Sequence, residues 1–312
     1  MDDLPVSILI VNYNGARHLD ACLRALEVQT LPRYRFEVIV VDNSSKDDSL
    51  AILRERFPWV RSVPLKQNTG FAEGNNIAAQ YAHGRTLVLL NNDTIADPHW
   101  LEELLHALSP DGRAASKLVF AHDPTLLNST GLFLLRDGRG MDRGFRQRDR
   151  GQYERTQEVF AGCGAALALP APPPGEPLLD PRYFVYYEDL DAQWRKRLAG
   201  HGPNYAPRSL IRHVHGAAAG DESPLFWFYV ERNRALTSLR NGDPFLAVYS
   251  ALGLGAKAVQ AVLRASLGAK GPKGRWPVAN AVVRALGSYL WHAPRVLVER
   301  FDVRSVPLRR RH

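Results

Sequence analysis

The chain has 312 residues, of which 45% are hydrophobic and 23% charged, an ordinary globular composition that is long enough for a sizeable core. Its net charge of +8 favours anionic partners, but we find no zinc finger, RNP-like motif or Walker A sequence, so we expect no nucleic-acid partner. Two separate cysteines exclude a disulfide framework and a cysteine zinc site, and fit a reduced cytoplasmic location.

Apolar runs alternate with helix-like patterns in the first third of the chain, which starts without the basic region or cleavage site of a signal peptide. Strands are expected at residues 6–11, 36–41, 60–65 and 86–90. Between them the spacing predicts three helices. The first buries Leu19, Cys22, Leu23 and Leu26, the second buries Leu50, Leu53 and Phe57, and the third covers residues 72–82. This alternation predicts a Rossmann-like α/β fold, with a mixed, mainly parallel sheet flanked by helices.

Polar residues follow three of these strands at the point where each strand ends. They form the segments Asn12–Gly15, Asp42–Ser45 and Asn91–Asp93. Parallel strands bring their carboxyl ends to one rim of the sheet, where ligands bind in open α/β folds. A single such turn is ordinary loop composition, whereas three at successive strand ends indicate a binding site.

The remainder of the chain is less regular and then helical. Residues 113–150 are irregular, with a charged, glycine-rich stretch expected to be a mobile loop, and 171–177 form a surface turn. Residues 183–200 are expected to begin as an aromatic strand and become a helix, and 204–216 to form an edge strand ending in two histidines. From Pro224 onward the pattern is helical and basic; its most apolar run, from Pro244, is interrupted by Lys257 and falls short of the roughly 20 residues that a membrane span needs.

Seven motifs in order resemble the family 2 glycosyltransferases of the GT-A fold, and among them the bacterial rhamnosyltransferase-like enzymes. They are VSILIVNYNG, EVIVVDNSS, NTGFAEGNN, LLNNDT, GCGAAL, YYEDLDAQWR and HVHG, and the resemblance covers roughly 6–240. It implies a catalytic domain at 1–223, with a nucleotide-binding part at 1–110 and an acceptor part at 111–223. A basic amphipathic helical extension would follow at 224–312.

The resemblance assigns Asp42 to the nucleotide base, with Tyr13 and Asn14 lining the same pocket. The alternatives are a helix N-cap for Asp42, for which Ser44 and Ser45 are better placed, and packing for Tyr13.

Ribose and diphosphate are assigned to the next motif. Asn68 and Gly70 would open a helix whose N–H groups bind an anion, and Asn75 would approach the ribose and diphosphate. The alternative is a helix start with a structural glycine.

Asn91, Asn92 and Asp93 correspond to the DxD segment of the family, in which Asn91 replaces the first aspartate. The resemblance implies that Asp93 binds Mg²⁺ or Mn²⁺, an ion that takes hard oxygen ligands and leaves positions for phosphate and water. A polar turn is the alternative. A family histidine that binds metal or phosphate matches His213, followed by Gly216, with His215 as the competitor. The two histidines are expected to point to opposite faces of a strand.

The catalytic pair is identified as Glu188 and Asp189, with Asp189 as the base that deprotonates the acceptor and Glu188 orienting it. Asp191 is the competing candidate for the base. For each aspartate the alternative to a catalytic role is a charge in the first turn of the helix, which the helix dipole favours. Arg232 and Asn233 match a further family pattern and would contact pyrophosphate, or else form a solvated helix face. Cys163 and Trp194 are expected to pack.

These assignments describe an inverting, metal-dependent glycosyltransferase. Its donor would be a nucleoside diphosphate sugar such as dTDP-L-rhamnose or a UDP-sugar, and its acceptor a cell-surface glycan or a polyprenyl-linked molecule. The alternatives are a non-catalytic sugar-nucleotide or glycan-binding scaffold and a nucleotidyltransferase. The basic C-terminal helices favour peripheral association with the inner face of the cell membrane over packing as a hairpin on the catalytic domain or a partner. The sequence does not determine whether the chain forms a homo-oligomer.

Overall fold

The computed structural model describes residues 6–200, 202–215, 223–268 and 276–304. The chain folds into two compact units, each drawn from more than one segment of the sequence. The first unit comprises Met1–Phe133, Met141–Phe184 and His201–Ala218, and the second comprises Leu134–Gly140, Val185–Gly200 and Ala219–His312.

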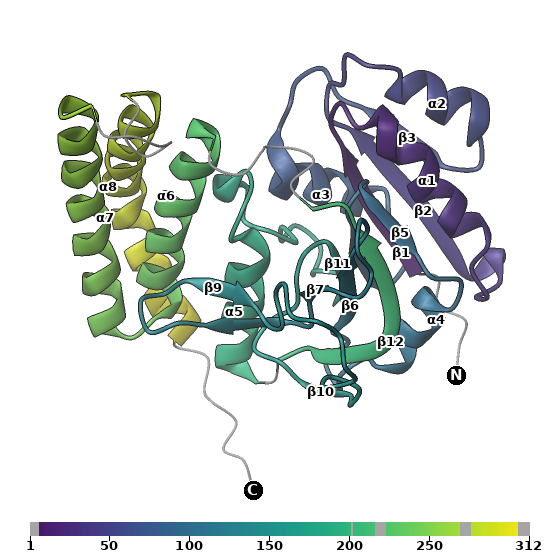
Figure 1. The fold of residues 1–312 in the computed structure, drawn as a ribbon. Coiled ribbons are helices and arrows are strands. Elements are labelled where there is room, and N and C mark those ends of the chain that lie inside the picture. The colour runs from purple at the N-terminus through teal and green to yellow at the C-terminus, as the bar shows by residue number, and fades with distance from the viewer. Residues whose placement is uncertain (1–5, 201, 216–222, 269–275, 305–312) are drawn as a thin grey trace, which may run out of the picture. The chain divides into compact units, whose positions relative to one another are not determined.

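The first unit is built on one sheet with strand order β10-β12-β6-β11-β4-β1-β2-β3, in which β5 also pairs with β12 and β7 with β6 (Figure 1). The strands are β1 (Val6–Asn12), β2 (Phe36–Asp42), β3 (Arg61–Pro64), β4 (Thr86–Leu90), β5 (Thr94–Ala96), β6 (Ala114–Phe120), β7 (Leu127–Ser129), β10 (Gln157–Glu158), β11 (Ala166–Pro170) and β12 (Asn204–His213). The helices of this unit are α1 (Ala16–Glu27), α2 (Ser49–Arg56), α3 (Gly70–Gln80) and α4 (Trp100–His106), with short 3-10 helices η1 (Arg33–Arg35) and η2 (Pro181–Tyr183). A separate hairpin pairs β8 (Leu132–Leu134) with β9 (Gly140–Asp142).

The expected mixed, mainly parallel sheet is confirmed. Strands β1, β2, β3 and β4 are parallel, and β11 runs antiparallel to β4. Apolar side chains of β1, β2 and β4 are buried on both faces, as expected for a parallel sheet covered by helices, whereas the edge strand β3 has no buried residue. In the register of β1 with β2, Asn12 lies directly beside Asp42, so the polar ends of the two strands are level.

Strand β6 is completely buried, although residues 113–150 were expected to be irregular. Its sequence, AASKLVF, does not show the continuous apolar run of a buried strand, because Lys117 lies within it. The Lys117 ammonium lies 2.6 Å from Asp149 and 2.7 Å from Glu154, so a buried charge is paired and the stretch expected to be a mobile loop is anchored to the sheet.

Three further sequence predictions are wrong. Strand β12 is internal, since β6 pairs with one side and β5 and β10 with the other. The aromatic segment before residue 188 is no strand, because Phe184, Tyr186 and Tyr187 have φ values of 62°, 68° and 71°. Leu50 is 37% exposed, whereas Leu53 and Phe57 are buried as expected.

The second unit contains α5 (Glu188–Ala199), α6 (Pro224–Asn241), α7 (Pro244–Ser266) and α8 (Trp276–Arg304). Helices α6, α7 and α8 lie side by side and bury a common core (Figure 1). Ser223 and Asp243 cap α6 and α7 by accepting bonds from Phe226 and Leu246 backbone N–H groups. Helix α7 continues past Lys257, the residue that interrupts its apolar run in the sequence, and has 23 residues. Among the described residues it is the one helix long and apolar enough to cross a membrane by length and composition alone.

Candidate active site

Hydrogen bonds join the polar ends of β1, β2 and β4 into one network in the first unit. The Asn12 amide donates to Asp42 Oδ2 over 3.0 Å, and Asn92 Nδ2 donates to Asn12 Oδ1 over 2.7 Å. Gly15 lies against this network, since a Cβ there would come within 2.1 Å of Asn92 Nδ2 and 2.3 Å of Asn12 Oδ1. A side chain at this position would therefore displace the bond between two strand ends.

Asp42 is only 1% exposed, and its second oxygen accepts from the Ser45 backbone N–H over 2.9 Å. It does not cap the following helix, because α2 begins at Ser49. Ser44 and Ser45 also precede that helix, so the capping role expected for them is wrong. Asp42 holds the strand end and the following turn in place.

Tyr13 and Asn14 lie at the surface beside this turn. Tyr13 is 43% exposed, and the exposed Asn14 accepts from the Lys46 backbone N–H over 2.8 Å. Their exposure leaves the aromatic ring and part of the amide accessible to a ligand.

The start of α3 is already hydrogen-bonded. Asn68 accepts from the Gly70 N–H, while the Phe184 carbonyl accepts from Phe71 and Ala72 at 2.6 and 3.0 Å. These N–H groups were expected to bind an anion, but in this structure the side chain of Asn68 and the carbonyl of Phe184 occupy them. Gly70 has φ of +82° and faces the Phe184 ring, so its role is to allow this close approach.

Asn75 was expected to approach a ribose or diphosphate, but its side chain is fully buried. Its Nδ2 donates to the Phe71 carbonyl over 2.9 Å, and its Oδ1 has no hydrogen-bond partner among the described residues. Asn75 therefore supports α3 from inside.

Asp93 and His213 form a buried pair, with Asp93 Oδ1 3.2 Å from His213 Nε2. Asn91 Nδ2 lies 3.5 Å from the same nitrogen. Burial acts to raise the pKa of the Asp93 carboxyl, but the hydrogen bond and charge of His213, with a smaller contribution from His18, hold it below its usual value. The carboxylate therefore stays ionised at neutral pH.

Asn128, at the middle of β7, fixes the ring of His213. Its Oδ1 lies 2.8 Å from His213 Nδ1, and its Nδ2 lies 3.3 Å from His215 Nδ1, which assigns the orientation of the amide. The two ring nitrogens of His213 thus face acceptors, Asn128 and Asp93. If Nδ1 donates to Asn128, the Nε2 lone pair faces the space beside Asp93 and Asn91, where a cation could bind.

This donor set fits a divalent ion. Neighbouring ligands of an octahedral ion at about 2.1 Å lie about 3.0 Å apart, close to the separation of the Asp93 and His213 atoms. No group of three or more His, Cys, Asp or Glu side chains with metal-binding geometry occurs among the described residues. Phosphate and water oxygens would therefore have to complete the coordination.

His215 does not point to the opposite face from His213, contrary to the expectation. Strand β12 ends at His213, and His215 has φ of 61°, so the alternation of a strand no longer applies. The two rings lie 5.6 Å apart and share Asn128. Gly216, the other part of the expected histidine motif, lies outside the described residues.

In the second unit, Glu188 and Asp189 begin α5 directly after Tyr187, whose φ of 71° is left-handed. Glu188 is buried, and burial, followed by the charge of Asp189, raises its pKa well above the usual value. Its Oε2 has no hydrogen-bond partner among the described residues. Asp189 is half-buried and accepts from the Leu190 N–H over 2.7 Å.

Asp191, the competing aspartate, is fully engaged in a buried network. It accepts from Arg195 and Arg240 at 3.0 and 2.8 Å, and from Asn241 at 2.8 Å. These partners neutralise the carboxylate and fasten α5 to α6. Of the two aspartates, Asp189 is the one that retains access to solvent.

Asn233 holds the turn that precedes Glu188. Its Nδ2 donates to the carbonyls of Val185 and Tyr186 at 2.9 and 2.7 Å, from a fully buried position on α6. Arg232 is also buried, which excludes a solvated helix face for both. Its Nε donates to Asn233 Oδ1 over 2.8 Å, and its guanidinium lies over the ring of Tyr229.

The first unit thus brings together Asp42, Asn92, Asn91, Asp93 and His213 at one set of strand ends, with Asn12 and Asn128 as supporting residues. Asn12 belongs to the polar segment noted in the sequence, but its role was not predicted. No sequence signal marks Asn128, which lies 85 residues from His213.

Known proteins resemble this chain in sequence. The sequence model of glycosyl transferase family 2 matches residues 7–166, about half of the chain. Glycosyltransferase AglE of Haloferax volcanii is 30% identical over 110 residues, which are 34% of this chain and 36% of that protein. The poly(ribitol-phosphate) β-N-acetylglucosaminyltransferase TarS of Staphylococcus aureus is 25% identical over 149 residues, 41% of this chain and 26% of that protein. The matches therefore span about a third of these relatives or less.

Solved structures share the fold over almost the whole chain. The TarS fragment 1–349 in complex with UDP superposes with a TM-score of 0.54 at 16% identity, covering 96% of this chain and 90% of that one. GalNAc-T7 with UDP, GalNAc and Mn²⁺ gives 0.62 at 14% identity, covering 98% and 58%. A mannosyltransferase of Pyrobaculum calidifontis with GDP-Man and Mn²⁺ gives 0.52 at 16% identity, covering 92% and 87%. These likenesses confirm the GT-A fold.

Proposed function

The chain belongs to glycosyl transferase family 2, and from this we propose that it is an inverting, metal-dependent transferase. It moves a sugar from a nucleoside diphosphate donor to a cell-surface glycan or lipid-linked acceptor. The observation that carries the proposal is the buried Asp93–His213 pair, which lies at the strand ends that β1, β2 and β4 share. The residues divide into a nucleotide-binding part at 1–110, an acceptor part at 111–223 and a helical extension at 224–312.

On the donor side, Tyr13 and Asn14 line the base pocket over Asp42, while Asn68 and Gly70 shape the start of α3 and Asn75 supports that helix from inside. Asp93 and His213, with Asn91 and Asn92 beside them, would hold Mg²⁺ or Mn²⁺. A bound ion supplies positive charge for the diphosphate leaving group. Solved neighbours crystallised with UDP or GDP-Man, two of them with Mn²⁺, support this donor class. The base and sugar proposed here are those of dTDP-L-rhamnose or a UDP-sugar, and Arg232 would assist at the pyrophosphate.

On the acceptor side, Asp189 is the proposed base. It removes the proton of the acceptor hydroxyl as that oxygen forms a bond to the anomeric carbon, and the bond to the nucleoside diphosphate breaks on the opposite face. Glu188 holds its proton more strongly, because burial and the neighbouring Asp189 raise its pKa. Glu188 would help to orient the acceptor from its position beside Asp189 at the start of α5. Asn233 is a positioning residue, since it fixes the turn from which both carboxyl groups project. The reaction would take place at the inner face of the cell membrane.

The test is the Asp189→Asn variant, assayed for release of nucleoside diphosphate from donor with Mn²⁺. Loss of a general base predicts turnover lower by about 10²–10⁴-fold with donor affinity unchanged. Glu176→Gln, in the exposed turn at 171–177, is the control and should keep full turnover. Equal turnover in Asp189→Asn and the control would remove Asp189 as the base. No release by the unaltered chain with any sugar nucleotide would favour a binding scaffold.

A further inference from the structure

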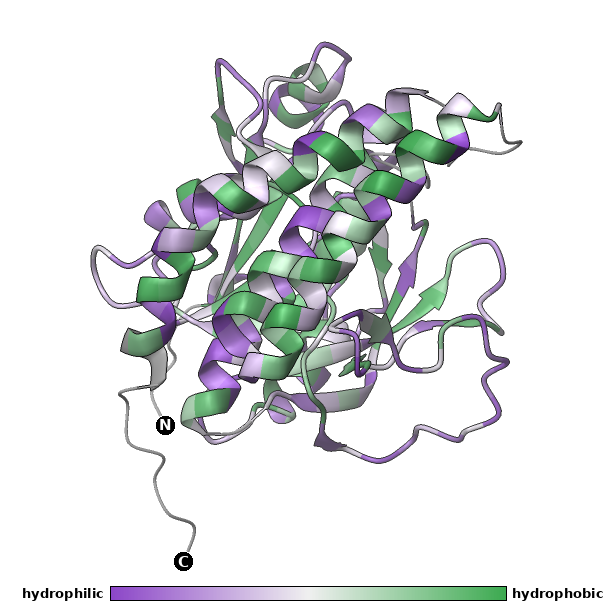
Figure 2. Cartoon of the chain, turned by 90° about the vertical axis from the view of Figure 1, so that its left-hand side faces the viewer, coloured by the Kyte–Doolittle hydropathy of each residue, from purple (hydrophilic) through white to green (hydrophobic). Residues whose placement is uncertain are grey.

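Helices α7 and α8 each expose an apolar face. On α7 and at its end these residues are Phe245, Val248, Tyr249, Leu252, Val259, Leu263 and Leu267. On α8 they are Trp276, Val283, Leu290, Trp291, Leu297, Val298 and Phe301. Within the described part of the chain these side chains are 44–83% exposed. Figure 2 shows hydrophobic stretches along both helices on the side turned to the viewer.

The spacing of these residues shows that each set forms a stripe. Trp276, Val283, Leu290 and Leu297 recur every seven residues on α8, which places them on one side of the helix. The opposite sides of both helices pack on each other and on α6, through residues such as Leu254, Ala258 and Val282. The packing of the three helices therefore leaves the two stripes uncovered. Apolar surface of this extent marks a site of interaction with another apolar surface.

The charged side chains of α7 and α8 limit which kind of partner can cover the two stripes. Among the side chains that the structure describes on α7 and α8, the exposed charged ones are Arg264, Arg284 and Arg295, all of them basic. A second copy in a symmetric dimer would present the same basic surface to itself, and like charges would oppose its binding. A transmembrane position for α7 would bring Lys257 and Arg264 into hydrocarbon and separate the helix from its core with α6 and α8. An apolar surface bordered by cations instead matches an anionic lipid interface.

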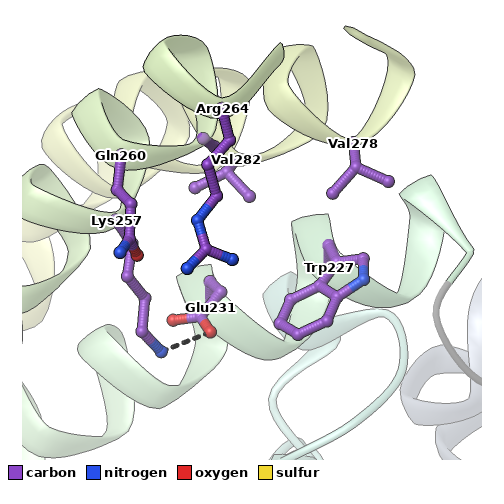
Figure 3. Close-up of a pocket in the computed structure, with 8 residues that line it drawn as sticks. Trp227, Glu231, Lys257, Gln260, Arg264, Val278 and Val282 are labelled. Carbon is purple, nitrogen blue, oxygen red and sulfur yellow. Dashed lines mark hydrogen bonds and ion pairs between the residues drawn. The ribbon is translucent and has the colours of Figure 1, made fainter. Parts of the chain in front are cut away.

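A cavity between α6, α7 and α8 is lined by two cationic side chains of α7, Lys257 and Arg264. Its volume is about 80 Å³, above the roughly 10–15 Å³ that one water requires, and its lining includes Trp227, Glu231, Lys257, Gln260 and Arg264. Figure 3 shows the side chains of Lys257 and Arg264 directed from α7 toward Glu231 on α6.

Positive charge exceeds negative charge at this cavity. Glu231 is buried and already accepts from Lys257 at 2.5 Å and from Arg234 at 3.1 Å. Arg264 adds a further cation. Burial lowers the pKa of Lys257, and the charges of Arg234 and Arg139 add to this effect, although Glu231 opposes it.

We propose that the α7 and α8 stripes dock on the surface of an anionic phospholipid bilayer, with the exposed cations Arg264 on α7 and Arg284 on α8 at the lipid headgroups. The apolar side chains enter the boundary between headgroups and acyl chains, and the helices lie in the plane of the interface. This inference deepens the membrane location within the proposed function. It is independent of catalysis, because it requires neither donor nor ion.

The experiment is sedimentation of the full chain, without donor, with vesicles of equal parts phosphatidylcholine and phosphatidylglycerol or of phosphatidylcholine alone. Trp291→Gln is compared with Tyr34→Gln, because both side chains are 80% exposed and Tyr34 lies in the first unit. Arg264→Gln is compared with Arg54→Gln, another exposed arginine. We expect binding to the anionic vesicles to fall about tenfold for Trp291→Gln and about fivefold for Arg264→Gln. Both controls should bind as the unaltered chain does.

Equal binding to the two kinds of vesicle, or equal loss in Trp291→Gln and Tyr34→Gln, would overturn the proposal. So would a dimer that Trp291→Gln splits into monomers in analytical ultracentrifugation, since the stripes would then be an interface between copies. Vesicle binding by a chain that fails to release nucleoside diphosphate would refute the proposed function only. A chain that releases it but ignores vesicles would refute this inference only.

Discussion

His213 lies between two acceptors, the Asp93 carboxylate and the Asn128 amide oxygen. Asn128 cannot turn its amide over without losing its contact with His215, so the acceptor stays directed at His213 Nδ1. An imidazole held through Nδ1 presents Nε2 in a fixed direction, as metal-binding histidines do. In the proposed metal site, the side chain of Asn128 would orient His213 without touching the ion.

Removing this support should weaken metal binding. For Asn128→Ala we expect Mn²⁺ affinity, measured by calorimetry with nucleoside diphosphate present, to fall about 10–100-fold. Asp93→Ala should lose measurable Mn²⁺ binding, because it removes a ligand. The control is His83→Gln, since His83 forms a comparable pair with Glu37 at 3.1 Å but lies before β4 rather than after it. Unchanged affinity in Asn128→Ala would mean that His213 is not a ligand held in this way.

Helices α1 and α2 begin at one shared carboxylate, that of Asp47. Its Oδ2 accepts from the Ala16 N–H over 2.9 Å, and its Oδ1 accepts from the Ser49 N–H over 3.1 Å and the Ser49 hydroxyl over 2.6 Å. Each helix has N–H groups in its first turn that lack helical partners, and Asp47 satisfies one in each. The two helices that follow β1 and β2 are thereby tied together beside the polar strand ends.

Asp47→Ala should lower the free energy of unfolding at neutral pH by about 0.5–2 kcal/mol, the range measured for the loss of a helix cap. Burial acts to raise the pKa of Asp47, but hydrogen bonds from Ser49 and Ala16 hold it below its ordinary value. A depressed carboxyl pKa contributes stability above the unfolded value, and that stability is lost as pH falls through the folded value. The difference between Asp47→Ala and the unaltered chain should therefore narrow below about pH 4.

Denaturant unfolding at neutral pH and at about pH 3 measures this difference. Asp48→Ala is the control, because Asp48 is exposed, carries the same charge and makes no side-chain cap bond. Equal losses in the two variants would show that charge alone, rather than capping, stabilises these helices.

The chain as a whole combines a sheet-based unit, which carries Asp42, Asp93 and His213, with a helical unit that carries Glu188 and Asp189. A donor that binds the folded chain and not the unfolded one raises the melting temperature by mass action. The gain at a ligand concentration of about 100 Kd is roughly 2.7 kcal/mol. Thermal unfolding therefore measures donor preference without knowledge of the acceptor.

We expect one class among UDP-, dTDP- and GDP-sugars to raise the melting temperature in the presence of Mn²⁺, and EDTA to abolish the rise. Asp93→Ala should show no rise with any donor. A shift of equal size with EDTA would show that the ion is not needed for donor binding, and equal shifts with all three bases would remove Asp42 and Tyr13 as base-selecting residues.

Much of the fold followed from local pattern. Continuous apolar runs gave β1, β2 and β4, helical spacing gave α1 and α3, and the polar residues after each strand located the rim at which Asn12, Asp42 and Asn92 meet. These features can be predicted from sequence because the hydrophobic periods of strands and helices appear within short runs of consecutive residues. Strand β6 was not predicted because Lys117 interrupts its apolar run. The charge of Lys117 is paired with Asp149 only in the folded chain.

Folding alone decided which side chains are engaged and which remain accessible. Asp189 and Asp191 look alike in sequence, but Arg240, 49 residues after Asp191, neutralises that carboxylate. His213 and His215 were expected on opposite faces, yet Asn128 joins them. Asn233 reaches the turn before Glu188 across 48 residues. Hydrophobic periodicity records which face of an element is buried, whereas the partner of a polar side chain depends on which distant segment packs beside it.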